Sequence, residues 1–142
     1  MIQILTGIQN TSAALDAEQT RLEVISQNIA NAHTIHDVDG KPYQRQVVVF
    51  ETALQNAMSG DGTTSLPAIQ VAKVARDTRL PLEVYDPGNP EANARGMVAM
   101  PNVNIHEEMA DLISASRTFE ANLAVVKNAR SMAMQTLAIG RH

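Results

Sequence analysis

Histidines with acidic neighbours are the residues of this sequence that could bind a metal ion. His33 and His36 are three residues apart, and Asp37 and Asp39 follow them in a segment rich in loop-forming residues. A structural zinc site needs four well-placed ligands, usually including cysteine thiolates, and the chain has no cysteine. We therefore expect these side chains to be solvated and predict no metal site.

Two segments match parts of metal-binding motifs. His106-Glu107-Glu108 has the start of a zinc-protease helix, but that motif needs a second histidine four residues after the first, where the sequence has Ala110. Asp37-Val38-Asp39-Gly40 has the opening of a calcium-binding loop, but the later acidic ligands of such a loop do not follow. With no phosphate-binding glycine loop and no nucleophile beside a recognisable base, the sequence predicts no catalytic residue, cofactor or small-molecule substrate.

The composition favours a helical protein that depends on partners. The chain has 142 residues, of which 44% are hydrophobic but only 3% aromatic. Aromatic side chains normally bury the largest areas in a core, so this chain must pack with small aliphatic residues, and we expect its stability to depend on burial between subunits. The net charge is −4 and the eleven basic residues are scattered, which argues against nucleic acid as a partner.

The sequence predicts two long helices, and any functional residues would be positioned by these helices. A first helix is predicted from Ile2 to Asn31 because apolar residues recur every seven positions, a spacing that places them on one stripe facing a partner helix. Its start has neither the basic residues nor the continuous apolar stretch of a secretory signal peptide. The predicted stripe consists of Ile8, Leu15, Leu22 and Ile29.

A second helix is predicted from Ile105 to Ile139, where apolar residues alternate by four and three positions. Asn104 is placed to cap its start, and Glu107 stands at the reciprocal position of a capping box. We expect this stripe to pair with that of the first helix or with a neighbouring subunit. Its principal members are Met109, Leu112, Phe119, Leu123, Val126 and Leu137.

The segment between the helices has a different character. It contains all six prolines, and three stretches of it have strand composition, at Gln46–Glu51, Ile69–Val74 and Leu82–Tyr85. The predicted fold is therefore mainly α with a small β insert, with the two long helices paired as an antiparallel, coiled-coil-like hairpin. Residues 1–34 and 103–142 would form the helical domain, and residues 35–102 a small outer domain of strands and loops.

Several segments together resemble the flagellar basal-body rod protein family, and within it the proximal-rod type. Asn28-Ile29-Ala30-Asn31-Ala32-His33-Thr34 resembles the signature near the end of the first helix in rod and hook proteins, and Gly40-Lys41-Pro42-Tyr43 opens a second similar segment. Met97 and Phe119 depart from the family pattern but keep apolar bulk. The motif residues that we single out are Asn28, Asn31, Thr34, Pro42, Tyr43, Tyr85, Pro87, Pro101, Asn102, Arg117 and Asn122.

The resemblance implies a structural subunit that assembles helically with copies of itself and with other rod proteins, transmits torque and lines the export channel. It also implies export through the flagellar type III apparatus, without a cleaved signal peptide, to the rod in the periplasmic space. Short polar side chains at Asn28, Asn31 and Thr34 can cap the helix end or simply end the helix. Arg117 can pair with acidic residues of an adjacent subunit or be solvated.

Three other readings stay open at this point. One is a cytoplasmic helical-hairpin adaptor or export chaperone, although such proteins rarely carry a proline-rich β insert. Another is a distal-rod or hook paralogue, although those chains usually have larger middle domains. The third is an enzyme with an unfamiliar site.

Overall fold

The computed structural model of the protein describes residues 2–37, 39–53 and 68–139. The chain is mainly helical with a small β insert, as the sequence predicts. Neither described helix combines the length and the apolar character needed to cross a membrane. In order, the elements are α1 (Ile2–Ala30), β1 (Gln46–Ala53), β2 (Ala68–Arg76), β3 (Leu82–Tyr85), β4 (Met97–Met100) and α2 (Ile105–Ile139).

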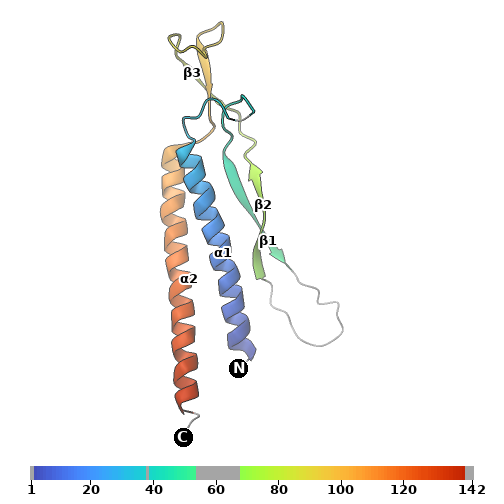
Figure 1. Ribbon diagram of the computed structural model, residues 1–142, viewed down its shortest axis with the longest axis vertical. Coiled ribbons are helices and arrows are strands. Elements are labelled where there is room, and N and C mark those ends of the chain that lie inside the picture. The colour runs from blue at the N-terminus through green and yellow to red at the C-terminus, as the bar shows by residue number, and fades with distance from the viewer. Residues whose placement is uncertain (1, 38, 54–67, 140–142) are drawn as a thin grey trace.

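The two helices lie side by side and run in opposite directions (Figure 1). We call the end of this pair where α1 begins and α2 finishes the open end. The strands and loops leave from the other end. With 35 residues, α2 spans roughly 50 Å at a rise of about 1.5 Å per residue, so the molecule is much longer than it is wide.

The least exposed side chains of α2 follow a spacing of four and three that differs in part from the predicted stripe. Leu112, Phe119 and Val126 of the predicted stripe belong to this set. The other three members, Met109, Leu123 and Leu137, are 50%, 36% and 59% exposed. The difference arises because small and polar residues, which an apolar pattern does not register, occupy the alternate positions. The observed set is Glu108, Leu112, Ala115, Phe119, Asn122, Val126, Ala129 and Ala133.

The four strands form two separate antiparallel pairs. β1 pairs with β2 from Gln46 opposite Arg76, with an irregularity between Val49 and Phe50, and this hairpin lies alongside α1 (Figure 1). β3 pairs with β4 at the extremity opposite the open end. β4 was not predicted, because four residues with only Val98 buried give too short a pattern to recognise without the partner strand.

The loop between β3 and β4 is fixed by a close approach of backbone and ring. Gly96 has a φ of +72°, which favours glycine because it has no Cβ. A Cβ at this position would lie 2.9 Å from Cε2 of Tyr85 and 3.3 Å from Cβ of Pro87. The loop therefore needs glycine at position 96 both for its backbone conformation and for contact with the Tyr85 ring.

The core of the single chain is small. The accessible surface of the whole chain is 10539 Å², whereas a compact monomer of this mass exposes about 7,100 Å². Most members of the core are small, which agrees with the scarcity of aromatic residues. The buried apolar side chains among the described residues are Ala17, Val24, Ile25, Ala32, Tyr43, Val98 and Ala115.

Candidate functional site

A fully buried asparagine joins the end of α1 to the start of β1. The amide nitrogen of Asn28 donates to the backbone carbonyl of Gln46 at 2.8 Å and to Oε2 of Glu108 at 3.1 Å. Its amide oxygen accepts from the backbone N–H of Gln46 and the hydroxyl of Tyr43, both at 2.9 Å. Both donors and both acceptor positions of the amide are thus used, and the side chain pairs with Gln46 as a neighbouring strand would.

A buried carboxylate from α2 meets an arginine from the loop before β1. Glu108 has no exposed surface, and its Oε1 accepts a hydrogen bond from Nε of Arg45. The Arg45 side chain is only 14% exposed. A buried charge is tolerated when it is paired and hydrogen-bonded, and here Arg45 and Asn28 supply one partner to each oxygen of Glu108.

Arg45 also connects two further segments, the residues after β2 and those before α2, and makes a second contact with α2. Its guanidinium lies 3.4 Å from Asp77, which follows β2, and 3.4 Å from Asp111 on α2. Its backbone N–H donates to Oδ1 of Asn102 at 2.7 Å, and its carbonyl accepts from the backbone N–H of Asp77 at 2.7 Å. We call Asn28, Tyr43, Arg45, Asp77, Asn102 and Glu108 the junction.

The contacts of the junction favour the charged forms of Arg45 and Asp77. Burial lowers the pKa of Arg45, but its hydrogen bond to Glu108, the charge of Glu108 and its hydrogen bond to Asp77 outweigh that effect and raise the pKa above its usual range. The backbone N–H of Arg79, followed by the Arg79 and Arg45 side chains, lowers the pKa of Asp77 below 3.8, although desolvation opposes the change. The stability that Asp77 contributes is therefore present above its unfolded-state pKa and is lost as the solution is acidified below it.

Removing the hydroxyl of the junction tyrosine should have a measurable cost. Burial, with the charges of Asp37 and Glu108, raises the pKa of Tyr43, so its hydroxyl stays protonated and donates to Asn28. Tyr43→Phe is expected to lower the free energy of unfolding in urea by about 1 kcal/mol, the net value of one hydrogen bond. Tyr85→Phe, at a ring 69% exposed, is the control and should leave it unchanged. Equal effects of the two substitutions would argue against the junction.

The turn after α1 is held by the next two motif residues. The Asn31 amide donates to the carbonyl of Gln27 at 2.9 Å, in the last turn of the helix, and its oxygen accepts from the Thr34 hydroxyl at 3.2 Å. The Thr34 carbonyl in turn accepts from the backbone N–H of Tyr43 at 3.1 Å. Asn31 and Thr34 thus position the segment that delivers Tyr43 and Arg45.

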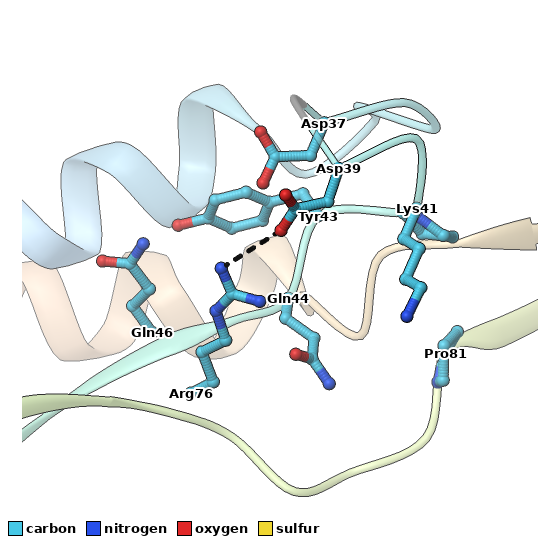
Figure 2. Close-up of a pocket in the computed structure, with 9 residues that line it drawn as sticks. Asp37, Asp39, Lys41, Tyr43, Gln44, Gln46, Arg76 and Pro81 are labelled. Carbon is cyan, nitrogen blue, oxygen red and sulfur yellow. Dashed lines mark ion pairs between the residues drawn. The ribbon is translucent and has the colours of Figure 1, made fainter.

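A surface hollow of about 480 Å³ lies beside Tyr43 (Figure 2). Asp37 and Asp39 line it with Arg76, and Arg76 lies 3.8 Å from Asp39 as an exposed ion pair. Within the described part of the chain, no three histidine or acidic side chains gather as a metal ion would require.

His36 links the loop between α1 and β1 to the loop between β3 and β4, because its Nε2 lies 2.9 Å from Oε2 of Glu91. The hydrogen bond to Glu91, followed by the charge of Glu91, raises the pKa of His36 above 6.5. Stability from this link is complete below the unfolded-state pKa and is lost as the pH rises through the raised value. NMR titration should give a His36 midpoint above 6.5 that falls in Glu91→Gln; an unchanged midpoint would contradict the link.

The other singled-out residues lie away from this cluster or at its edge. Pro101 is buried next to Asn102, and Pro42 is half-buried next to Tyr43. Pro87 packs near Gly96 with Tyr85. On α2, Arg117 is exposed and Asn122 is half-buried. The α1 residues Ile8, Leu15, Leu22 and Ile29 are half-buried, as are Leu112, Phe119 and Val126 of α2.

Sequence reasoning missed the charged members of the junction. Arg45 and Asp77 carry no local pattern, and Glu108 reads as an ordinary acidic residue in the first turn of a helix. One signal was available for Glu108, because it lies four residues before Leu112 and seven before Ala115. An acid on a stripe that is otherwise buried needs a buried partner.

The arrangement is suited to holding segments together. Asn28 is saturated with hydrogen bonds, and both oxygens of Glu108 are engaged. Arg45 contacts Glu108 and Asp111 of α2, and it also contacts Asn102 and Asp77 outside that helix. These contacts fix the direction in which β1 and β2 leave the helix pair.

Comparison with known proteins identifies two family matches. Residues 8–34 match the family described as flagella basal body rod protein, and residues 94–139 match flagellar basal body rod FlgEFG protein C-terminal. The chain is 39% identical to the flagellar basal-body rod protein FlgC of Yersinia enterocolitica over 99% of this chain and 100% of that one. It is 40% identical to FlgC of Escherichia coli O157:H7 over 91% and 92% of the two chains, and 37% identical to FlgC of Bacillus subtilis over 92% and 94%.

Proposed function

The chain belongs to the FlgC family of flagellar basal-body rod proteins, and from this membership we propose how the single subunit takes its place in the rod. The protein is a structural subunit and not an enzyme. In our proposal α1 and α2 form the inner part of the rod wall and line the export channel, while the strands face outward. Torque passes between subunits through the packed helices.

The observation that carries this proposal is the apolar surface that α2 leaves uncovered. The whole chain exposes about 3,400 Å² more surface, polar and apolar together, than a compact monomer of its mass. A standard interface takes about 800 Å² from each partner, so a surface of this size suits contact with several neighbours. Patches of exposed apolar side chains commonly mark interaction sites. Those of α2 are Met109, Ile113, Leu123, Val125, Met132, Met134, Leu137 and Ile139.

We infer that the predicted stripe serves two kinds of packing. Leu112, Phe119 and Val126 are half-buried, which suits a coiled-coil-like seam with α1. Met109 and Leu123 are among the exposed residues. Apolar side chains of such a stripe normally pack between the side chains of a facing helix, so these two would face a helix of a neighbouring subunit. The exposed Arg117 would pair with acidic residues of that neighbour.

The proposed division into two parts places residues 1–34 and 103–142 in the helical domain and 35–102 in the outer domain. The junction is the bridge between them, because Asn28 and Glu108 come from the first part and Tyr43, Arg45 and Asp77 from the second. Fixing this bridge would present the outer domain at one angle in every copy, as a regular assembly requires.

We propose that the subunit reaches the periplasmic space through the flagellar type III export apparatus, a route for which no removal of a leader peptide is expected. There it would assemble with copies of itself and other rod proteins. A cytoplasmic adaptor or chaperone is disfavoured, because FlgC relatives match the chain over nearly its whole length.

The direct test is to image basal bodies that contain a labelled subunit. A strain lacking the gene should not swim and should lack complete basal bodies, and the labelled chain should restore both and appear in the rod. Full swimming in the deletion strain, or label confined to the cytoplasm, would overturn the proposal.

A further inference from the structure

The two extremities of the molecule differ in charge. Residues 77–111, which include β3, β4 and the first turns of α2, contain seven acidic and two basic residues, a net charge of −5. At the open end, residues 2–15 contain no charged residue, and the charged residues within 121–139 are Lys127 and Arg130, both basic. These regions lie at opposite ends of the long axis (Figure 1).

The acidic extremity contains a hollow of about 470 Å³, lined by apolar side chains together with the polar Arg79, Asn102, Asn104 and His106. Leu80 and Leu82 form one wall and are 86% and 61% exposed, so they are among the most exposed large apolar side chains of the chain. We call this feature the tip hollow. Its walls include Leu80, Leu82, Pro101, Val103, Ile105 and His106.

The walls of the tip hollow are connected to each other. The amide of Asn102 donates to the carbonyl of Arg79 at 2.7 Å, and the Arg79 guanidinium donates to Glu107 of α2 at 3.3 Å. Both segments are also attached to the junction through Asp77 and Asn102. A surface held in place before binding loses less freedom when a partner arrives.

The open end has the properties that would suit this hollow. Met132, Met134 and Leu137 are 59%, 62% and 59% exposed, and methionine adapts its shape to an apolar recess. The basic Lys127 and Arg130 are opposite in charge to Glu83 and Glu107, the acids next in sequence to the lining residues Leu82 and His106, although Glu107 also pairs with Arg79 of the lining. This difference in charge favours one orientation of approach. Contact between one extremity and the opposite extremity of a neighbour continues along an axis instead of closing on itself.

We propose that the tip hollow receives the open end of the helix pair of a neighbouring rod subunit, an end where α2 exposes several large apolar side chains together with the basic Lys127 and Arg130. The proposal rests on the function proposed above and specifies one contact within it. The C-terminal family match over residues 94–139 is named for the proteins FlgE, FlgF and FlgG, so related subunits share this part of the chain.

Crosslinking in assembled basal bodies tests the contact. The full chain carries benzoylphenylalanine at position 80, replaces the native subunit, and is irradiated before the basal bodies are isolated. The expected product joins position 80 to the last twenty or so residues of the C-terminal helix of a rod subunit, identified by mass as a copy or a relative. The same probe at exposed Ala94, outside the hollow, should not give this product.

A link from position 80 to any other segment, or no link although the subunit is incorporated, would overturn the tip contact alone. Absence of the unsubstituted chain from basal bodies would instead overturn the rod function. The two failures are therefore distinguishable.

A substitution gives an independent measure. Because Leu82 is exposed, Leu82→Asp should leave the urea midpoint of the purified chain unchanged while lowering incorporation into basal bodies by about tenfold or more. Thr78→Asp, exposed and outside the hollow, should incorporate normally. Normal incorporation of Leu82→Asp would contradict the proposal.

Discussion

Arg45→Met is expected to lower the free energy of unfolding by about 3–5 kcal/mol, the range found when one partner of a buried ion pair is removed. The substitution keeps a long apolar stem but leaves Glu108, which has no exposed surface, with Asn28 as its remaining junction partner. Native domains have only about 5–15 kcal/mol of stability in total. Urea unfolding followed by circular dichroism would therefore show a large fall in midpoint.

Arg79→Met is the matched control for this prediction. Arg79 also contacts two acids, Asp77 and Glu107, but its side chain is 47% exposed, and pairs in water are worth about 0–1 kcal/mol. The double variant Arg45→Met with Glu108→Leu should recover part of the loss, since no unpaired charge then stays buried. Equal costs for Arg45→Met and Arg79→Met would show that the junction is not a buried ion pair.

Leu123→Asp is expected to abolish rod assembly and swimming while changing the stability of the isolated chain by less than about 0.5 kcal/mol, as is usual for surface positions. Leu123 is 36% exposed in the single subunit, so water can solvate the new carboxylate there. In a packed interface between subunits the same charge would be buried without a partner. Swimming assays, with incorporation into basal bodies measured in parallel, check the two parts.

The control for Leu123→Asp is Ala121→Asp, which adds the same charge to an exposed position of α2 outside the predicted stripe. We expect it to retain assembly. Normal swimming of the Leu123→Asp strain would mean that Leu123 does not face a neighbouring subunit.

The helices were predictable because their signal is local. α1 and α2 end within a residue of the predicted limits, since apolar spacing and the cap at Asn104 act over a few turns. The Asn104 side chain accepts from the backbone N–H of His106 at 3.0 Å. Glu107, expected to complete the capping box, instead accepts a hydrogen bond from Arg79, because a tertiary partner is present that the pattern cannot register.

The junction was only partly predictable because its partners are distant in sequence. Arg45 and Glu108 are 63 residues apart, and Asn28 and Glu108 are 80 apart. The resemblance singled out Asn28, Tyr43 and Asn102 as motif residues, but nothing in their local pattern shows that they meet. β4 escaped prediction for a similar reason, since its extended form depends on pairing with β3.

These long sequence separations also bear on how fast the chain can fold. Glu108 cannot be buried until Arg45 and Asn28 arrive, and bringing such distant segments together carries an entropic cost before any contact forms. Contacts within a helix, by comparison, join residues that are close in sequence and form quickly. The junction is therefore expected to form after the turns of α1 and α2, so that the direction of the β1–β2 hairpin is fixed late in folding.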